Sequence, residues 1–143
     1  MLEAIATMIA LDVPKLGLLV LPSTGPVQRT IHDLRTLGVD AREVDLRRNE
    51  VLEGGAENPS LLVGTLATSR GLDLPELTHV FLVGMLEGRA VDGRAVDSYL
   101  HVAGRVGRFG RSGKVVSVVD GDGEERMRRV LARAGIEPGS IRV

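Results

Sequence analysis

The chain has 143 residues, which fits one domain and lets folding bury roughly 68–70% of the surface of the unfolded chain. Hydrophobic residues make up 43% of it, charged residues 26%, and the net charge is −1, which is ordinary globular usage and argues against a disordered tail. Aromatic residues make up only 2% and cysteine is absent, which excludes a stacked aromatic platform for single-stranded bases, a disulfide framework and a thiolate metal site.

The first predicted elements are a helix, a strand and a second helix. Apolar residues recur at helical spacing over residues 2–11, which predicts a short amphipathic helix. The aliphatic run 16–21 is typical of a strand that is buried on both faces of a parallel sheet. The second helix has Ser23 or Thr24 as its N-cap, and Gly38 ends it.

The rest of the chain continues this alternation of strands and helices. The last helix has acidic residues in its first turn and arginines after it, as the helix dipole favours, and Gly135 ends it. The predicted strands are 41–44, 61–64, 79–83 and 115–119, the last being the clearest buried strand, and the predicted helices are 96–103 and 124–134. The pattern predicts an α/β sandwich with a mainly parallel sheet. We expect a single domain over residues 1–143, with a short N-terminal helix in 1–14 and a tail in 135–143.

A basic segment precedes the last predicted strand. Residues 101–119 contain four basic residues and no acidic one, and their glycines are three residues apart. Glycines let the backbone approach a ligand closely, and Arg105 and Arg108 share a face if the segment is helical. Two guanidinium groups held by a rigid scaffold at the end of a sheet are suited to phosphate oxygens. The alternative is a solvated basic loop.

Three known site motifs are absent. Gly113-Lys114 resembles the end of a P-loop, but position 108 is arginine and position 115 is valine, so the chain has no Walker A motif. It also has no Gly-x-Ser-x-Gly nucleophile elbow. The acidic residues from Asp120 onward imitate the start of a calcium loop, but Glu125 replaces the glycine that such a loop requires.

A second polar segment, residues 64–75, follows the predicted strand 61–64. Thr65 and Arg70 are expected near the same end of the sheet as the basic segment. Taken alone, the run Arg70-Gly71-Leu72-Asp73 could be a surface turn with a local ion pair.

Together the two segments resemble motifs V and VI of superfamily 2 helicases. The nearest group is the second RecA-like domain of DEAD-box RNA helicases. Residues 65–75 are similar to the pattern Thr-Asp-x-x-x-Arg-Gly-Leu-Asp-x-Pro, and residues 99–108 to Tyr-x-His-Arg-x-Gly-Arg-x-Gly-Arg. Residues 18–24 are similar to motif IV, and the resemblance extends over about residues 16–134. It implies a RecA-like three-layer sandwich.

The resemblance also implies a half-site for ATP. Arg105 and Arg108 would be arginine fingers that reach a γ-phosphate, while Gly71 and Asp73 would contact the nucleotide, Asp73 at its ribose. ATP would be bound mainly by a first RecA-like domain, in cis or in trans, and Mg²⁺ would enter only through that nucleotide. His101 would link the two domains.

RNA is the second partner that the resemblance implies. Thr65, Thr24 and Arg70 would hold RNA phosphates, and contacts of this kind position a strand without reading its sequence. We expect no membrane partner and an intracellular location, and a ribonucleoprotein complex is a further possible partner.

The sequence departs from the family pattern at two positions. Leu66 stands where motif V has aspartate, and Val102 stands where motif VI has arginine. Two functions therefore stay open. The first is the C-terminal half of an ATP-dependent RNA helicase, which would be inactive as an isolated chain because the Walker A and Asp-Glu-Ala-Asp motifs are missing. The alternative is a catalytically degenerate, helicase-derived module that binds RNA or a ribonucleoprotein, or serves as a structural component of an organellar ribosome or an assembly complex.

Overall fold

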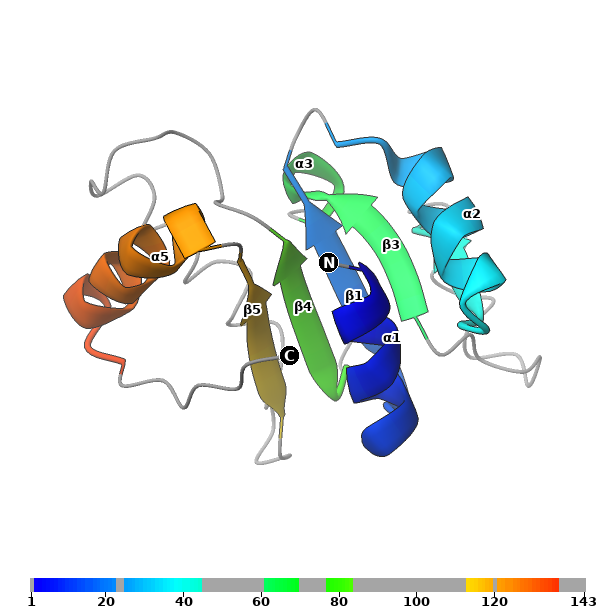
Figure 1. The fold of residues 1–143 in the computed structure, drawn as a ribbon, viewed down its shortest axis with the longest axis horizontal. Helices are drawn as coiled ribbons and strands as arrows, with labels where there is room; N and C mark the ends of the chain where they lie inside the picture. Colours follow the sequence, from blue (N-terminus) through cyan, green and yellow to red (C-terminus); the bar gives the residue numbers. More distant parts are fainter. Residues whose placement is uncertain are drawn as a thin grey trace.

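Five parallel strands form the middle layer of the molecule (Figure 1). The fold is given by a computed structural model, which describes residues 2–22, 25–44, 61–69, 77–83, 113–119 and 121–136. In chain order the elements are α1 (Leu2–Leu11), β1 (Gly17–Leu21), α2 (Val27–Thr36), β2 (Ala41–Glu43), β3 (Leu61–Thr65), α3 (Leu66–Ser69), β4 (His79–Val83), β5 (Lys114–Val118) and α5 (Gly121–Arg133). The strand order is β2-β3-β1-β4-β5 and every pairing is parallel.

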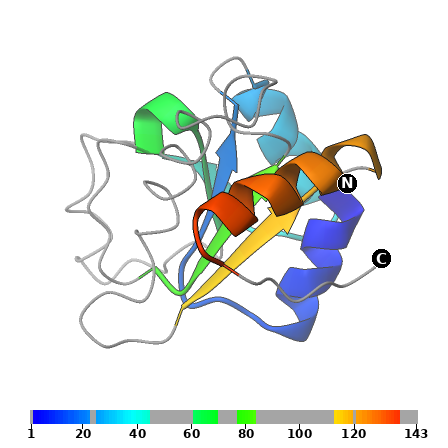
Figure 2. The ribbon, with the colours of Figure 1, turned by 90° about the vertical axis from the view of Figure 1, so that its left-hand side faces the viewer.

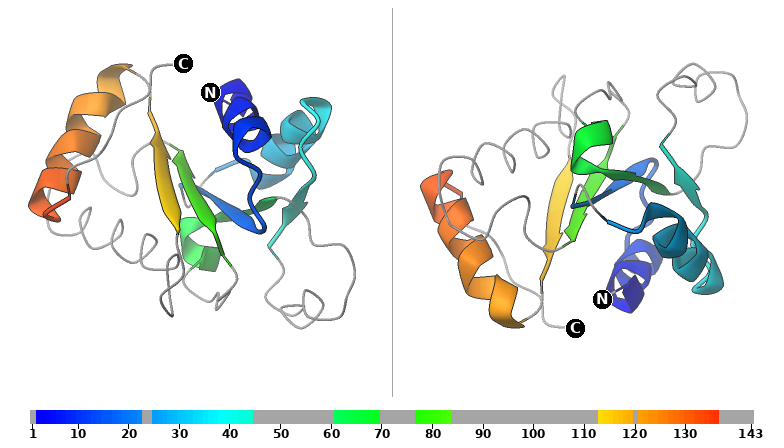
Figure 3. Two further views of the ribbon diagram at one scale, coloured as in Figure 1. Left: turned by 90° about the horizontal axis from the view of Figure 1, so that it is seen from below. Right: turned by 90° about the horizontal axis from the view of Figure 1, so that it is seen from above.

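Helices cover both faces of the sheet. Figure 3 shows α1 and α2 on one side and α5 on the other, and Figure 2 shows α5 crossing in front of the strands. Successive side chains of a strand point to opposite faces, so Leu18 and Val20 pack toward α5 while Leu19 and Leu21 pack toward α1 and α2. All four are buried. The prediction of a RecA-like three-layer sandwich with a parallel sheet is confirmed.

Most predicted elements agree with the observed ones to within a few residues. The predicted N-cap of the second helix, Ser23 or Thr24, is wrong, because α2 begins at Val27 and Pro26 is its N-cap. The helix over 2–11 and the strand over 79–83 have the predicted bounds, and the other described strands begin or end one residue away from them. The helix that we predicted over 124–134 begins at Gly121 and ends at Arg133. The short helix α3 was not predicted. The helix predicted over 96–103 lies outside the described residues.

The expectation that 115–119 is the clearest buried strand is wrong. The side chain of Lys114 is exposed and residues 115–118 are half-buried. The reason is position: β5 is the last strand in the described sheet order, and β4 is the neighbour it pairs with. An apolar run reports which residues can be buried, but it does not tell a central strand from an outer one.

Glycine ends α2 and α5 in the predicted way. Gly38 (φ 89°) and Gly135 (φ 75°) adopt the left-handed conformation that favours glycine. After α2, the N–H of Gly38 donates to the carbonyl of Arg35 at 3.0 Å and that of Val39 to Leu34 at 3.0 Å, which is a Schellman motif. After α5, the N–H of Gly135 donates to Ala132 at 3.1 Å and that of Ile136 to Leu131 at 2.9 Å.

No helix within the described ranges is both long enough and apolar enough to cross a membrane.

Candidate functional site

The candidate site lies at the carboxyl edge of the sheet, where β1 and β3 end side by side. Thr65 is the last residue of β3, it pairs with Leu21 at the end of β1, and its side chain is half-buried. The chain turns after β1, since the N–H of Gly25 donates to the carbonyl of Pro22 at 2.8 Å. Open parallel sheets bind their ligands at this edge.

Thr65 and Thr68 bond to each other across the start of α3. The N–H of Thr65 donates to Thr68 Oγ1 at 2.8 Å, and the Thr68 hydroxyl donates to the carbonyl of Thr65 at 3.0 Å. The N–H of Thr68 points back to Thr65 Oγ1 at 3.4 Å. Thr65 Oγ1 thus accepts a backbone N–H. It also lies 3.4 Å from Thr68 Oγ1, to which its O–H can donate when no ligand oxygen takes that bond. We did not predict the role of Thr68, although the spacing Thr-x-x-Thr after a strand resembles a capping box.

Two neighbours of Thr65 fix this turn. A Cβ added to Gly64 would lie 2.7 Å from Thr68 Oγ1 and 3.1 Å from Val44 Cγ2, so a side chain there would displace Thr68. Leu66 is fully buried in the core between the sheet and α5. The residue that stands in place of the family's aspartate therefore serves as a packing residue here.

The other predicted site residues lie outside the described residues. They are Thr24, Arg70, Gly71, Asp73, His101, Arg105 and Arg108. Thr65 is thus the predicted site residue whose surroundings the structure describes. The last basic residue of the basic segment, Lys114, begins β5 at the amino edge of the sheet, opposite to the edge where Thr65 ends β3.

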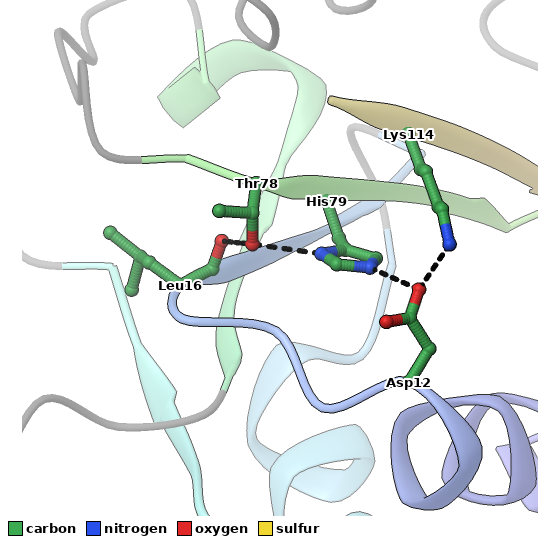
Figure 4. A network of polar contacts seen from close by, with 5 residues as sticks. All are labelled: Asp12, Leu16, Thr78, His79 and Lys114. Carbon is green, nitrogen blue, oxygen red and sulfur yellow. Dashed lines mark hydrogen bonds and ion pairs between the residues drawn. The ribbon is translucent and has the colours of Figure 1, made fainter. Parts of the chain in front are cut away.

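A second polar cluster occupies the amino edge. His79 Nε2 lies 2.9 Å from Asp12 Oδ2, and Lys114 Nζ contacts the same oxygen (Figure 4). The hydrogen bonds from His79 and from Lys114 lower the pKa of Asp12 to about 2. The sequence gives no signal for this cluster, because its members are far apart in the chain. Within the described ranges, no three His, Cys, Asp or Glu side chains are grouped so as to hold a metal ion.

Comparison with known proteins identifies the family. A profile described as the helicase conserved C-terminal domain matches residues 28–110, more than half of the chain. The chain belongs to this family. The matched helicase C-terminal domain includes both segments that resemble motifs V and VI, and the fold is that of a C-terminal RecA-like domain of the DEAD-box type.

Two curated relatives of this helicase domain are bacterial. The DEAD-box ATP-dependent RNA helicase CshC of Bacillus cereus is 34% identical over 76 residues, which are 53% of this chain and 18% of the relative. The ATP-dependent RNA helicase SrmB of Escherichia coli is 35% identical over 83 residues, which are 57% of this chain and 17% of the relative. The chain thus spans less than a fifth of the length of either relative.

Solved structures share the fold of this helicase domain. Escherichia coli SrmB bound to regulator of ribonuclease activity A gives a TM-score of 0.71 at 24% identity, over 99% of this chain and 82% of that one. Saccharomyces cerevisiae Dbp5 bound to RNA and ADP BeF3 gives a TM-score of 0.72 at 19% identity, over 96% of this chain and 37% of that one. At these identities the likeness shows the fold alone.

Proposed function

We propose that this domain is the C-terminal half of an ATP-dependent RNA helicase. The observation that carries the proposal is the family match over residues 28–110, because the match includes both segments that resemble motifs V and VI, residues 65–75 and 99–108. The relatives with the same domain are named ATP-dependent RNA helicases. The turn at Thr65 supports the proposal, because it leaves a hydroxyl donor at the sheet edge where parallel α/β domains bind ligands.

In this proposal the RNA backbone contacts the carboxyl edge of the sheet. Thr65 donates its hydroxyl to a phosphate oxygen, while its bonds with Thr68 keep it in one orientation. Thr24 and Arg70 supply further phosphate contacts. Because none of these groups contacts a base edge, binding is sequence-independent and weakens as salt is raised.

In the same proposal, two arginines of the basic segment contact the nucleotide. Arg105 and Arg108 reach the γ-phosphate of an ATP held on a first RecA-like domain, and Asp73 accepts a hydrogen bond from the ribose. A guanidinium placed in this way stabilises charge on the transferring phosphoryl group. Gly71 lets the backbone pass close to the nucleotide, and His101 joins the two domains. Mg²⁺ arrives with the nucleotide.

The test uses the full protein that carries this domain, with RNA-stimulated ATP hydrolysis and RNA affinity measured separately. Arg108→Ala is expected to lower hydrolysis by roughly 10³–10⁵-fold, as the loss of an arginine finger does, with little change in RNA affinity. Arg111→Ala is the matched control, since it removes an arginine of the same segment that has no proposed contact. Unchanged hydrolysis in Arg108→Ala would refute the finger role. ATP turnover by the isolated 143-residue chain, abolished by Arg105→Ala, would refute the proposal that the domain is only half of the ATP site.

The burial of Leu66 favours one second candidate. A leucine that is fully buried where motif V has aspartate is compatible with a helicase-derived module that has kept its fold and lost catalysis. In that case the full protein binds RNA or a ribonucleoprotein, or is a structural part of an organellar ribosome or an assembly complex. The same experiment separates the two functions, because the module shows no hydrolysis that RNA or Arg108→Ala could change.

A further inference from the structure

Asp12 lies where the first helix meets the sheet. Its backbone N–H donates to the carbonyl of Met8 at 2.9 Å and so ends α1. Its carboxylate oxygen Oδ2 is shared by His79 Nε2, at 2.9 Å, and by Lys114 Nζ. As Figure 4 shows, one carboxylate thus joins the end of α1 to the first residues of β4 and β5.

Both ends of the segment between α1 and β1 are held by polar contacts. The backbone N–H of Thr78 donates to the carbonyl of Leu16 at 3.0 Å, and the Thr78 hydroxyl lies 3.3 Å from the same oxygen. That hydroxyl is also 2.8 Å from His79 Nδ1, so the ring is held on both of its nitrogens. The orientation of His79 toward Asp12 is therefore fixed from within the sheet.

Apart from Pro14, which is buried, the apolar side chains beside Asp12 are mostly exposed. The flanking side chains Leu11 and Val13 are 83% and 69% exposed. Within α1, the buried side chains are Ile5 and Ile9, which pack on the face of the sheet. The last turn of α1 is thus attached both by the buried side chain of Ile9 and by the charge of Asp12.

We propose that Asp12, His79 and Lys114 form an electrostatic latch that holds the end of α1 against the sheet. When the latch is lost, α1 unfolds locally more often while the sheet stays folded. The charged and titratable partners that the contacts give Asp12 are His79 from β4 and Lys114 from β5. Lys114 is the last basic residue of the basic segment, so the latch ties α1 to that segment at the point where β5 begins. The inference does not depend on the proposed function.

Hydrogen exchange of the backbone amides tests the latch in the 143-residue chain. Asp12→Ala is expected to speed exchange of the hydrogen-bonded amides of α1 by about fivefold, with the amides of β1, β3 and β4 unchanged, since exposed ion pairs are weak and local openings are independent of global unfolding. Lys114→Gln keeps the contact between Asp12 and His79. It is expected to give a smaller increase in the exchange rate, again confined to the amides of α1. High salt should speed exchange of α1 in the unsubstituted chain and have less effect in Asp12→Ala.

Asp40→Ala is the matched control. Asp40 is also a half-exposed carboxylate in an ion pair, with Arg42 Nε at 3.4 Å, but it lies between α2 and β2. It should leave α1 unchanged. The latch is overturned if Asp12→Ala speeds exchange equally in α1 and the sheet, or has no effect on α1. If Asp12→Ala does not fold, Lys114→Gln and the salt series decide by the same criterion.

Discussion

Leu66 shows how one residue can change its role within a motif. It occupies the position of an aspartate in the family pattern, yet its side chain is fully buried in the core between the sheet and α5. The neighbouring turn does not need a carboxylate, because Thr65 and Thr68 satisfy each other's polar groups. An aspartate at this position would therefore bury a charge among the apolar side chains of this core.

We predict that Leu66→Ala lowers the free energy of unfolding by about 2–4 kcal/mol, because it removes buried methyl groups and leaves a cavity. Leu66→Asp should lower it further, although it restores the residue of the family pattern. Urea denaturation followed by circular dichroism measures both changes. Leu11→Ala, at a side chain that is 83% exposed, is the control and should stay within about 0.5 kcal/mol of the unsubstituted chain. Equal stability of Leu66→Asp and the unsubstituted chain would contradict the packing role.

Asp12 makes stability depend on pH in the acid range. Its pKa in the folded chain is about 2, below the ordinary value of 3.8, so the unfolded chain binds more protons between these values. The contribution of Asp12 is therefore complete above the ordinary pKa and is lost as the pH falls toward 2. The difference in unfolding free energy between the unsubstituted chain and Asp12→Asn should shrink over this interval. Denaturation at a series of pH values measures it, and a difference that stays constant would show that the carboxylate charge is not what matters.

At the scale of elements, the helices α2 and α5 end where glycine permits a left-handed turn. Gly38 has φ 89° and no heavy atom within 4 Å of an added Cβ, so strain in the backbone, not a clash, opposes other residues there. The Schellman bonds of Gly38 and Val39 depend on this conformation.

Gly38→Ala is expected to lower the free energy of unfolding by about 1 kcal/mol, because alanine is strained at positive φ. Gly38→Asn should cost less, since asparagine tolerates the left-handed region better. Thermal or urea denaturation of the two variants compares them directly. If alanine proves as stable as asparagine at this position, the positive φ is not the limiting factor.

Local patterns in the sequence were sufficient for most elements, and their limits are physical. The spacing of Ile5 and Ile9 predicts α1, and Gly38 and Gly135 predict two helix ends, because these signals act over a few residues. The outer position of β5 could not be predicted, since strand order depends on which strands meet in the folded sheet. The contact of Asp12 with His79 spans 67 residues and its contact with Lys114 spans 102, so no local pattern encodes them.

For the candidate site, the structure tests the predicted position of one residue, Thr65, and not the predicted chemistry. Thr65 was predicted at the end of a strand and is found there, at the carboxyl edge of the sheet. The bonds that orient it come from Thr68, which no motif singled out. The functional roles of Arg105, Arg108 and Asp73 remain predictions, because these residues lie outside the described part of the chain.

Over the whole molecule, the candidate ligand site and the latch lie at opposite edges of the sheet. The carboxyl edge carries Thr65, and the amino edge carries the latch of Asp12, His79 and Lys114. The parallel arrangement separates them by the length of the strands, so a substitution in the latch can be made without touching the candidate ligand site. This separation is what allows the two proposals to be tested independently in one chain.

The central place of β1 has a consequence for how the domain is made. Both neighbours of β1 are encoded later: β3 begins at residue 61 and β4 at residue 79. As the chain leaves the ribosome, the aliphatic run of β1 has no strand to pair with until those segments have been synthesised. The aliphatic strand β1 is therefore synthesised before either of its neighbours and stays unpaired until they follow. We expect the nascent domain to bind chaperones that recognise exposed aliphatic segments.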